Sequence, residues 1–337
     1  MSGLPVSNDE PTIRDVARQA GVSIATVSRA LKNQPGLTED TRRQVLEAAA
    51  ALGYDLAKLR PVKARRIGFF MQRQNHALTS NPFYFPVLHG VEDACRKEGV
   101  ALSYCQVAPE DNIPEIIRIQ EVDALICVGH FDPEMLTAFK RSGKPVILVD
   151  NHQPGYLCVN TDNLTGAYQA TQHLIAMGRK RIAFITGPHH FSIHQRQQGY
   201  MQALQDAGRE IDPALMVQRY PIDEQAGAYP AMQQLLALKD PPDAVFAYND
   251  ETAIVAIQAC LDAGLSVPED IAIAGYDDIP NGAHGNPSLT TVHVDKEVLG
   301  REAVKLILHP KRKDDQVLVP VRLIIRQSTK SRASRRR

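Results

Sequence analysis

The chain has 337 residues, carries 38 Lys and Arg against 38 Asp and Glu, and is 44% hydrophobic. This length allows two or three domains with sizeable cores, and the composition is that of a soluble globular protein. No apolar run approaches the roughly 18–20 residues that span a bilayer, and the N-terminus lacks a secretory-signal pattern, so we expect a cytoplasmic protein.

Charge is distributed unevenly along the chain. Residues 1–66 hold 11 Lys and Arg against 7 Asp and Glu, residues 67–329 hold 22 against 31, and residues 330–337 hold five basic residues and no acidic one. A basic head on an acidic body favours contact between the head and phosphate groups. A fluctuation of solvated surface charge would give a similar excess, so charge alone leaves both interpretations open.

Two short helices joined by a glycine turn are predicted between Thr12 and Asn33. Thr12 and Asp15 have the spacing of a capping box, and Ser23 is the expected N-cap of the second helix. Gly21 stands between them, where the backbone needs a positive φ. The pattern is typical of a helix-turn-helix, whose second helix lies in the major groove of DNA. An ordinary helical hairpin would have the same pattern.

A third helix is predicted after the N-cap Thr38, with Gly53 as its C-terminal stop. The three helices repeat apolar residues at helical spacing, which indicates a small common core. The expected inward positions are Ile13, Val16, Ala17, Ala20, Val27, Ala30, Leu31, Val45, Leu46, Ala49 and Leu52.

The run TIRDVARQAGVSIATVSRALKN, followed by TRRQVLEAAAALGY, resembles the DNA-binding head of the LacI/GalR family of bacterial transcriptional repressors. The resemblance extends nearly to the end of the chain and implies operator DNA as a partner. It also implies that Ile24 and Ala25, at the start of the second helix, set sequence preference. The implied DNA-binding residues are Thr12, Ser23, Ile24, Ala25, Thr26, Ser28, Arg29, Asn33, Leu56 and Leu59.

The basic segment 55–66, DLAKLRPVKARR, would be the hinge linker of such a protein. In the family this segment forms a helix on operator DNA and inserts a leucine into the minor groove, for which Leu56 and Leu59 are the candidates. Here the usual Pro-Asn start is missing, the linker is about four residues short, and Pro61 limits a helix to residues 55–60. A flexible basic tether that contacts only phosphates is the alternative.

From Arg66 onward, short apolar strands alternate with amphipathic helices, which predicts parallel sheets covered on both faces. We expect an α/β core of two doubly wound parallel-sheet lobes, as the resemblance also implies, similar to periplasmic sugar-binding proteins; an eightfold barrel is the competing architecture. The expected strands are RIGFFM, VALSYC, DALICVG, PVILVD, RIAFITG, MVQRYP, DAVFAYND and IAIAGYDD, and then LTTVHVD and VLVPVRLIIRQS. The expected helix starts are near Pro86, Ile113, Pro133, Leu164, Arg196, Gln225, Glu251 and Glu297.

These elements divide the chain into five parts. The chain is expected to cross between the lobes near Asn160–Asp162, near Thr291–His293 and near Pro320. The expected parts are a disordered N-terminus (1–11), the DNA-binding head (12–54), the hinge linker (55–66), the core (67–329) and a basic tail (330–337). Within the core, lobe 1 takes about 67–161 and 293–320, and lobe 2 takes about 162–292.

Ligands of open α/β sheets bind at the carboxyl ends of the strands. The polar and aromatic residues found there suit a sugar-like effector, and the resemblance implies effector contacts at Arg196, at Asn249 or Asp250, and at Asp277. Asp250 could instead cap the helix at Glu251, and Asp277 could close a turn. The full candidate set is Phe83, Tyr84, Asp150, His190, Arg196, Asn249, Asp250 and Asp277.

His189, His190 and His194 raise the possibility of a metal site, but they lie in a segment expected to be a loop and no third ligand is evident. The five cysteines include no CxxC pair. The sequence has neither a glycine-rich phosphate loop nor a nucleophile elbow. We therefore expect no metal, no cofactor and no enzymatic activity.

The sequence predicts a homodimeric repressor of carbohydrate utilisation genes, controlled by a small sugar or sugar derivative bound between the lobes. A purine, a sugar acid or a sugar phosphate is the alternative effector, since Phe83 and Tyr84 could stack on a base. A solute-binding protein with a helical appendage is the more distant alternative. The sequence leaves open whether the effector induces or co-represses.

Overall fold

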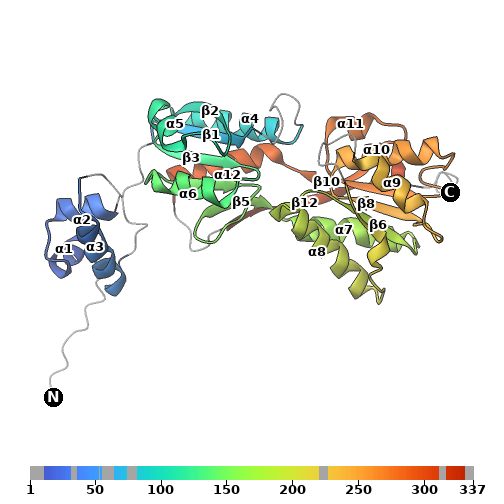
Figure 1. Cartoon of the computed structure of the whole chain (residues 1–337), viewed down its shortest axis with the longest axis horizontal. Helices are drawn as coiled ribbons and strands as arrows, with labels where there is room; N and C mark the ends of the chain where they lie inside the picture. Colours follow the sequence, from blue (N-terminus) through green and yellow to red (C-terminus); the bar gives the residue numbers. More distant parts are fainter. Residues whose placement is uncertain are drawn as a thin grey trace, which may run out of the picture.

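The computed structural model describes residues 11–31, 36–52, 54, 64–73, 82–219, 227–310 and 316–330. Three of the predicted DNA-binding residues, Asn33, Leu56 and Leu59, lie outside these ranges, as does Gly53. Figure 1 shows a small helical head and two α/β lobes. No helix among the described residues is long and apolar enough to cross a membrane.

The head consists of α1 (Ile13–Gln19), α2 (Ile24–Leu31) and α3 (Glu39–Ala51). Thr12 forms the predicted capping box with Asp15, and the hydroxyls of Ser23 and Thr38 accept hydrogen bonds from the backbone N–H of Thr26 and Thr41. Gly21 has a φ of +60°, as expected at the turn between the first two helices. The predicted helix-turn-helix start and stop signals are thus confirmed.

The core of the head differs from the prediction at one position. Val45, Ala48 and Ala49 are buried, whereas Leu46 is 43% exposed. Residues 45, 48, 49 and 52 repeat at the spacing of a single helical face, and residue 46 is turned about 100° away from it. The prediction that Leu46 points inward was wrong.

Lobe 1 is a six-stranded sheet in the order β11-β5-β4-β3-β1-β2, in which every neighbouring pair is parallel. Its strands are β1 (Arg66–Gln72), β2 (Ala101–Val107), β3 (Ala124–Val128), β4 (Val146–Val149), β5 (Leu157–Thr161) and β11 (Gln316–Val319). Its helices are α4 (Tyr84–Lys97), α5 (Ile113–Ile119), α6 (Pro133–Arg141) and α12 (Lys296–Leu308).

Lobe 2 is a second six-stranded sheet in the order β12-β10-β9-β8-β6-β7, with only β10 and β12 antiparallel. Its strands are β6 (Ile182–Thr186), β7 (Met216–Gln218), β8 (Ala244–Ala247), β9 (Ala272–Asp277), β10 (Thr290–Val294) and β12 (Val321–Ile324). Its helices are α7 (Asn163–Ala176), α8 (Phe191–Asp206), α9 (Ala228–Leu236), α10 (Asp250–Asp262) and α11 (Pro280–His284), with single turns at Pro213–Leu215 and Gln327–Thr329.

The two-lobed prediction is confirmed, and the barrel alternative is wrong. Strands β3 and β8 are buried along their whole lengths, as expected when helices cover both faces of a parallel sheet. The strand predicted at VLVPVRLIIRQS divides at Pro320 into β11 and β12, which belong to different sheets. Strand β5 and helix α11 were not predicted.

Two further boundaries differ from the sequence-based expectation. Helix α8 begins at Phe191 and not near Arg196, so the segment predicted as a loop is largely helical. The second crossing was expected at Thr291–His293, but β10 remains in the second sheet through Val294. The chain therefore passes into lobe 1 at Asp295, whose side chain caps α12.

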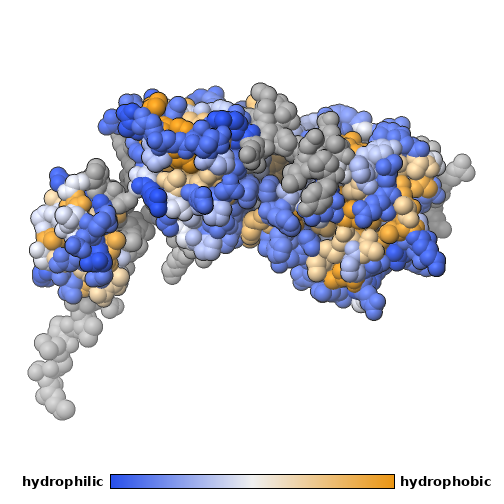
Figure 2. Space-filling model, viewed as in Figure 1, coloured by the Kyte–Doolittle hydropathy of each residue, from blue (hydrophilic) through white to orange (hydrophobic). Residues whose placement is uncertain are grey.

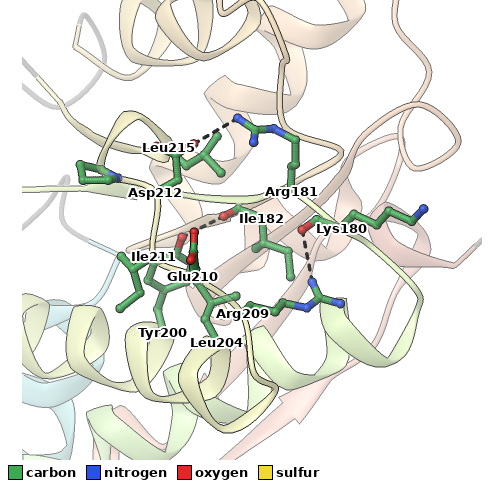
Figure 3. Close-up of a pocket in the computed structure, with 11 residues that line it drawn as sticks. Lys180, Arg181, Ile182, Tyr200, Leu204, Arg209, Glu210, Ile211, Asp212 and Leu215 are labelled. Atoms are coloured by element: carbon green, nitrogen blue, oxygen red, sulfur yellow. Dashed lines mark hydrogen bonds and ion pairs between the residues drawn. The ribbon is translucent and has the colours of Figure 1, made fainter.

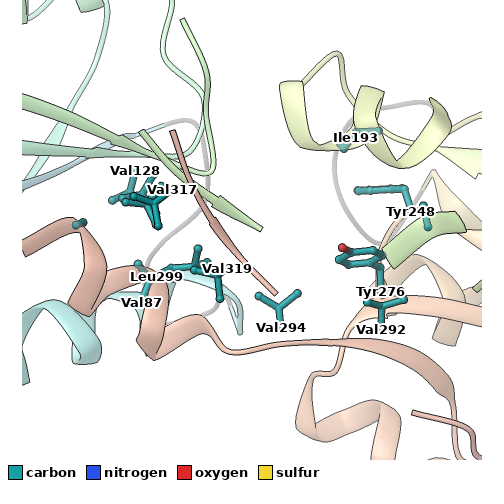
Figure 4. Close-up of a cluster of buried hydrophobic side chains, with 14 of the residues drawn as sticks. Val87, Val128, Ile193, Tyr248, Tyr276, Val292, Val294, Leu299, Val317 and Val319 are labelled. Atoms are coloured by element: carbon teal, nitrogen blue, oxygen red, sulfur yellow. The ribbon is translucent and has the colours of Figure 1, made fainter. Parts of the chain in front are cut away.

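One apolar cluster continues through both lobes. It includes Val128 and Val317 from the first sheet and Tyr276 and Val292 from the second. Figure 4 shows Val294 between these two groups, on the segment that connects the lobes. The outer surface is different, since Figure 2 shows hydrophilic side chains over most of the visible face with smaller apolar areas between them.

Candidate functional site

The carboxyl ends of the strands in the two sheets face each other. Strands β5 and β11 each run out of lobe 1 into lobe 2, and β10 runs out of lobe 2 into lobe 1. Every strand except β12 is parallel to the crossing strand of its own sheet. The carboxyl ends of these strands therefore point from both lobes into the same interlobe region. The general rule for open α/β sheets places ligand sites at this edge.

A buried ion pair lies at the lobe 2 side of this region. Arg196, on α8, is 4% exposed and its Nη2 lies 3.1 Å from Oδ1 of Asp277, the last residue of β9. Its Nε donates to Oδ1 of Asn163 at 2.9 Å, and its Nη1 donates to the carbonyl of Tyr248 at 2.6 Å. The guanidinium also lies 3.7 Å from the centre of the Tyr276 ring. Three protein oxygens and one aromatic ring thus fix the orientation of the guanidinium.

Asp277 is held in an unusual conformation. Its φ is +107° and that of Asp278 is +54°, in the region that ordinary residues seldom adopt. The ammonium of Lys296, on the first turn of α12, donates to the carbonyl oxygen of Asp277. Burial raises the pKa of Asp277, although the charge of Arg196 opposes this shift. Lys296 is therefore an interlobe contact, from a helix of lobe 1 to the end of a strand of lobe 2.

Lobe 1 contributes an aromatic and acidic surface opposite this pair. The hydroxyl of Tyr84 donates to Oδ2 of Asp150 at 2.9 Å, and Phe83 packs edge-to-face on Tyr84. Asp150 directly follows β4 and has a φ of +56°. Burial raises the pKa of Asp150 to about 6, and Arg196 and Tyr84 lower it in part. We call Tyr84, Asp150, Arg196, Asp277 and Lys296 the interlobe cluster.

Two predicted effector residues have structural roles inside lobe 2. The side chain of Asn249 accepts a hydrogen bond from the Thr252 N–H and so caps α10. Asp250 is fully buried, and its two carboxyl oxygens accept hydrogen bonds from the Thr291 hydroxyl and the Ile279 N–H. Burial raises the pKa of Asp250 to about 8. The sequence placed the cap one residue too late, because Asn and Asp are both good capping residues.

The histidine-rich segment after β6 is a loop only at its start, from Gly187 to His190. His190 is the N-cap of α8, so His194 and Arg196 lie on that helix. The ring of His190 stacks on His130, which follows β3. No group of three or more His, Cys, Asp or Glu among the described residues could hold a metal ion.

Sequence reasoning missed several residues that the structure places in this region. Asn163 and Tyr276, which orient Arg196, were not among the predicted site residues. The sequence signal for Lys296 is its position directly after Asp295, which caps α12 where the chain passes from lobe 2 into lobe 1. The other missed residues are His130, His152, Phe191 and Tyr248.

A separate cavity of about 370 Å³ lies in lobe 2 at the amino ends of β6 and β7, the edge away from the interlobe cluster (Figure 3). Its apolar lining includes Ile182, Tyr200 and Leu215. Several of its polar groups are already paired, such as the Tyr200 hydroxyl with the Ile182 carbonyl and Arg181 with Asp212. The cavity does not coincide with any predicted site residue.

The head presents the other candidate site, on α2. Ile24 is 47% exposed, and Ser23, Ala25 and Arg29 are also exposed. The hydroxyls of Ser23 and Thr26 contact each other at 2.8 Å. An exposed apolar residue at the start of a helix, flanked by hydroxyls and a cation, has the chemistry that base edges and phosphates require. The hydroxyl of Thr12 donates to Asp15 at 2.6 Å.

Known proteins resemble both the helical head and the α/β core of this chain. Residues 12–55 match the model of bacterial regulatory proteins of the lacI family, and residues 171–329 match the periplasmic binding protein-like domain. The chain is 33% identical over 340 residues to the HTH-type transcriptional repressor CytR of Escherichia coli (strain K12), covering 95% of this chain and 96% of that protein. The chain belongs to the LacI family.

Other members of this LacI-family group are similarly related. The HTH-type transcriptional repressor PurR of Haemophilus influenzae (strain PittEE) is 32% identical, covering 95% of this chain and 99% of PurR. A solved complex of the transcriptional regulator CelR with cellobiose superposes with a TM-score of 0.72 at 29% identity, covering 94% of this chain and 99% of CelR. These relatives are regulators and not enzymes.

Proposed function

We propose that the chain is a sequence-specific DNA-binding repressor whose affinity for its operator is controlled by a small, neutral, hydroxyl-rich effector such as a sugar. The observation that carries the effector assignment is the buried Arg196–Asp277 pair at the facing carboxyl ends, with Asp150 opposite it. Carboxylate oxygens accept hydrogen bonds from vicinal hydroxyls, and the remaining guanidinium N–H groups donate to them.

A neutral effector fits this site better than an acidic one. Each nitrogen of Arg196 already contacts a protein oxygen, and the charge of Asp277 compensates that of the guanidinium. An added carboxylate or phosphate would meet Asp150 and Asp277, whose two negative charges already balance the positive charges of Arg196 and Lys296. The cellobiose complex of CelR supports a saccharide as the class of ligand.

A planar base is the second candidate. The edge-to-face pair of Phe83 and Tyr84 supplies aromatic surfaces at the interlobe cluster. Aromatic faces bind bases as well as the apolar faces of sugar rings. The two candidates differ in the hydrogen-bonding pattern that they offer to Asp150 and Asp277.

The division of labour that we propose follows the sequence-based boundaries. Residues 12–54 would recognise the operator sequence, and residues 67–329 would bind the effector and form the dimer. Residues 55–66 would connect these two parts and respond to effector binding in the core. A homodimer places two heads on a pseudo-palindromic operator in the bacterial cytoplasm. Effector binding would change the angle between the lobes, with a coupling free energy of about 1–3 kcal/mol between the two sites. The target genes that we propose are those of carbohydrate utilisation.

The DNA-binding half is tested with duplexes selected by the full-length protein from a randomised pool. Arg29→Ala should weaken binding to the selected duplex at least tenfold, because the exposed guanidinium of α2 would lose a phosphate or base contact. Arg43→Ala, on α3, is the matched control, since Arg43 is exposed and paired with Asp40. Equal binding by the full chain and by a deletion of residues 12–54 would contradict the repressor assignment.

The effector half is tested by calorimetry and thermal shift against sugars, sugar acids, sugar phosphates and purines. A neutral sugar should bind and should change the operator affinity. Asp150→Asn should weaken effector binding at least tenfold and leave the operator affinity without effector unchanged, whereas Glu134→Gln, at an exposed site on α6, should change neither. A thermal shift with a purine and none with any sugar would favour the second candidate.

A further inference from the structure

Two ring stacks join the lobes outside the interlobe cluster. The imidazoles of His130 and His190 have centres 4.8 Å apart and planes within 9° of parallel. The rings of His152 and Phe191 have centres 5.1 Å apart and an interplanar angle of 25°. In each stack one ring belongs to lobe 1 and the other to lobe 2.

In lobe 2, both stacks lie away from the strand through which the chain leaves that lobe. His130 and His152 follow β3 and β4, and His190 and Phe191 follow β6. The three crossings belong to β5, β10 and the β11–β12 segment, and β6 is separated from β10 by two strands in the second sheet. Any opening about the crossing segments must therefore separate the stacked rings.

The surroundings of the His130–His190 stack suit a neutral pair of imidazoles. Burial lowers the pKa of His190 to about 4, and the neighbouring rings of His130 and His189 contribute to this shift. The carboxylate of Asp132 lies 3.7 Å from Nε2 of His130, on the lobe 1 side of the stack. A proton on His190 would face the His130 imidazole, which disfavours the charged ring in the stack.

We propose that the two stacks form an interlobe latch that holds the lobes together independently of effector, and that a proton on His190 releases it. The latch goes beyond the proposed function, since it requires neither DNA nor effector. It gives His190, in the segment after β6, a role that is neither metal binding nor catalysis.

The sign of the pH dependence follows from linkage. The closed state holds His190 below its ordinary pKa of 6.5, so an open state with solvated rings binds a proton more readily. Closure is fully favoured above about pH 6.5 and is lost as the pH falls from there towards about 4. Within this window each pH unit shifts the ratio of closed to open molecules by up to about tenfold.

The latch is tested by measuring the distance between spin labels on the two lobes of the full-length protein. Labels are attached at Glu134→Cys on α6 and Gln202→Cys on α8, both at exposed positions. The native cysteines are all buried and should remain unlabelled. Distances are recorded by double electron–electron resonance at pH 7.5 and pH 5.0, without DNA or effector.

The wild-type latch should give one short distance at pH 7.5 and a second, longer population at pH 5.0, at least tenfold more abundant than at pH 7.5. His190→Ala and His130→Ala should each show the longer population already at pH 7.5. The double variant His130→Phe and His190→Phe keeps two stacking rings that cannot be charged, so it should remain closed at both values. His309→Phe, at an exposed site after α12, is the control and should behave as wild type.

Two results would overturn the latch. If both alanine variants had the wild-type distance distribution at pH 7.5, the stacks would not hold the lobes. If the double phenylalanine variant opened at pH 5.0 as much as wild type, protonation of this pair would not be the release. A wild type that is already open at pH 7.5 would contradict the proposal as well.

Discussion

The two lobes are built on the same plan. Each sheet has six strands, and the two strand orders correspond position by position. Each lobe also has a pair of helices in close backbone contact, α4 with α12 and α7 with α8. A Cβ on Gly300 would lie 2.2 Å from the Val87 carbonyl, and a Cβ on Gly199 would lie 2.2 Å from the Leu164 carbonyl.

The lobes differ at the edges that face each other. Lobe 2 presents a buried cation, Arg196, which Asn163, Tyr248 and Asp277 orient. Lobe 1 presents the Tyr84–Asp150 pair, and the pKa of Asp150 is raised to about 6. The same scaffold thus carries two kinds of surface at the facing edges of the lobes. One surface has a compensated, pre-oriented charge, and the other carries groups that titrate.

The largest expected effect comes from removing the cation of lobe 2. Arg196→Met leaves the Asp277 carboxylate buried without its partner, and the free energy of unfolding should fall by about 4 kcal/mol. Urea unfolding measures the change. Arg118→Met, which breaks an exposed pair with Glu115 on α5, is the control and should change the free energy of unfolding little, because solvent screens the pair. Similar losses in the two variants would show that lobe 2 is not organised around the buried pair.

The shared scaffold is tested by adding one methyl group to each lobe. Gly199→Ala and Gly300→Ala should each lower the free energy of unfolding by about 3 kcal/mol, because the clashing atom is a backbone oxygen that cannot rotate away. Gln202→Ala, at an exposed position of α8, should have little effect. A loss in only one of the two glycine variants would break the equivalence of the helix pairs.

The titrating surface of lobe 1 predicts a pH-dependent difference. The folded-state pKa of Asp150 is raised from 3.8 to about 6, so its stability contribution is complete below about pH 3.8 and is lost as the pH rises through about 6. Asp150→Asn removes this dependence. Between pH 4 and pH 7 the stability of the variant relative to wild type should therefore rise by about 2 kcal/mol. A constant difference across this range would mean that Asp150 ionises normally.

The smallest effect concerns one hydrogen bond of lobe 1. Tyr84→Phe should cost about 1 kcal/mol and should raise the pKa of Asp150 above about 6, since the tyrosine hydroxyl stabilises the carboxylate. Tyr156→Phe removes a similar hydrogen bond, to the Leu136 carbonyl, away from the interlobe cluster. It should cost a similar amount without changing the titration of Asp150, which carboxyl ¹³C shifts report. An unchanged Asp150 titration in Tyr84→Phe would show that the two groups are not coupled.

Local features of the chain were determined by the sequence itself. The caps Thr12, Ser23 and Thr38 and the turn at Gly21 depend on residues within three or four positions, so they could be read directly. The alternation of apolar strands with helices was sufficient for the two-lobed fold. It was also sufficient to place Asp150 and Asp277 at the carboxyl ends of strands and Arg196 in the segment that follows β6.

Tertiary structure alone decided which of these residues meet and what each one does. Leu46 points outward because the packing of its helix depends on segments distant in the sequence. Asp250 is buried inside lobe 2 because it accepts hydrogen bonds from Thr291 and Ile279, which are also distant in the sequence. Lys296 and the ring pair of His130 and His190 gain their partners only when the lobes come together. Spacing along the chain carries no information on such contacts, since they join strand ends that are neighbours only across the interlobe region.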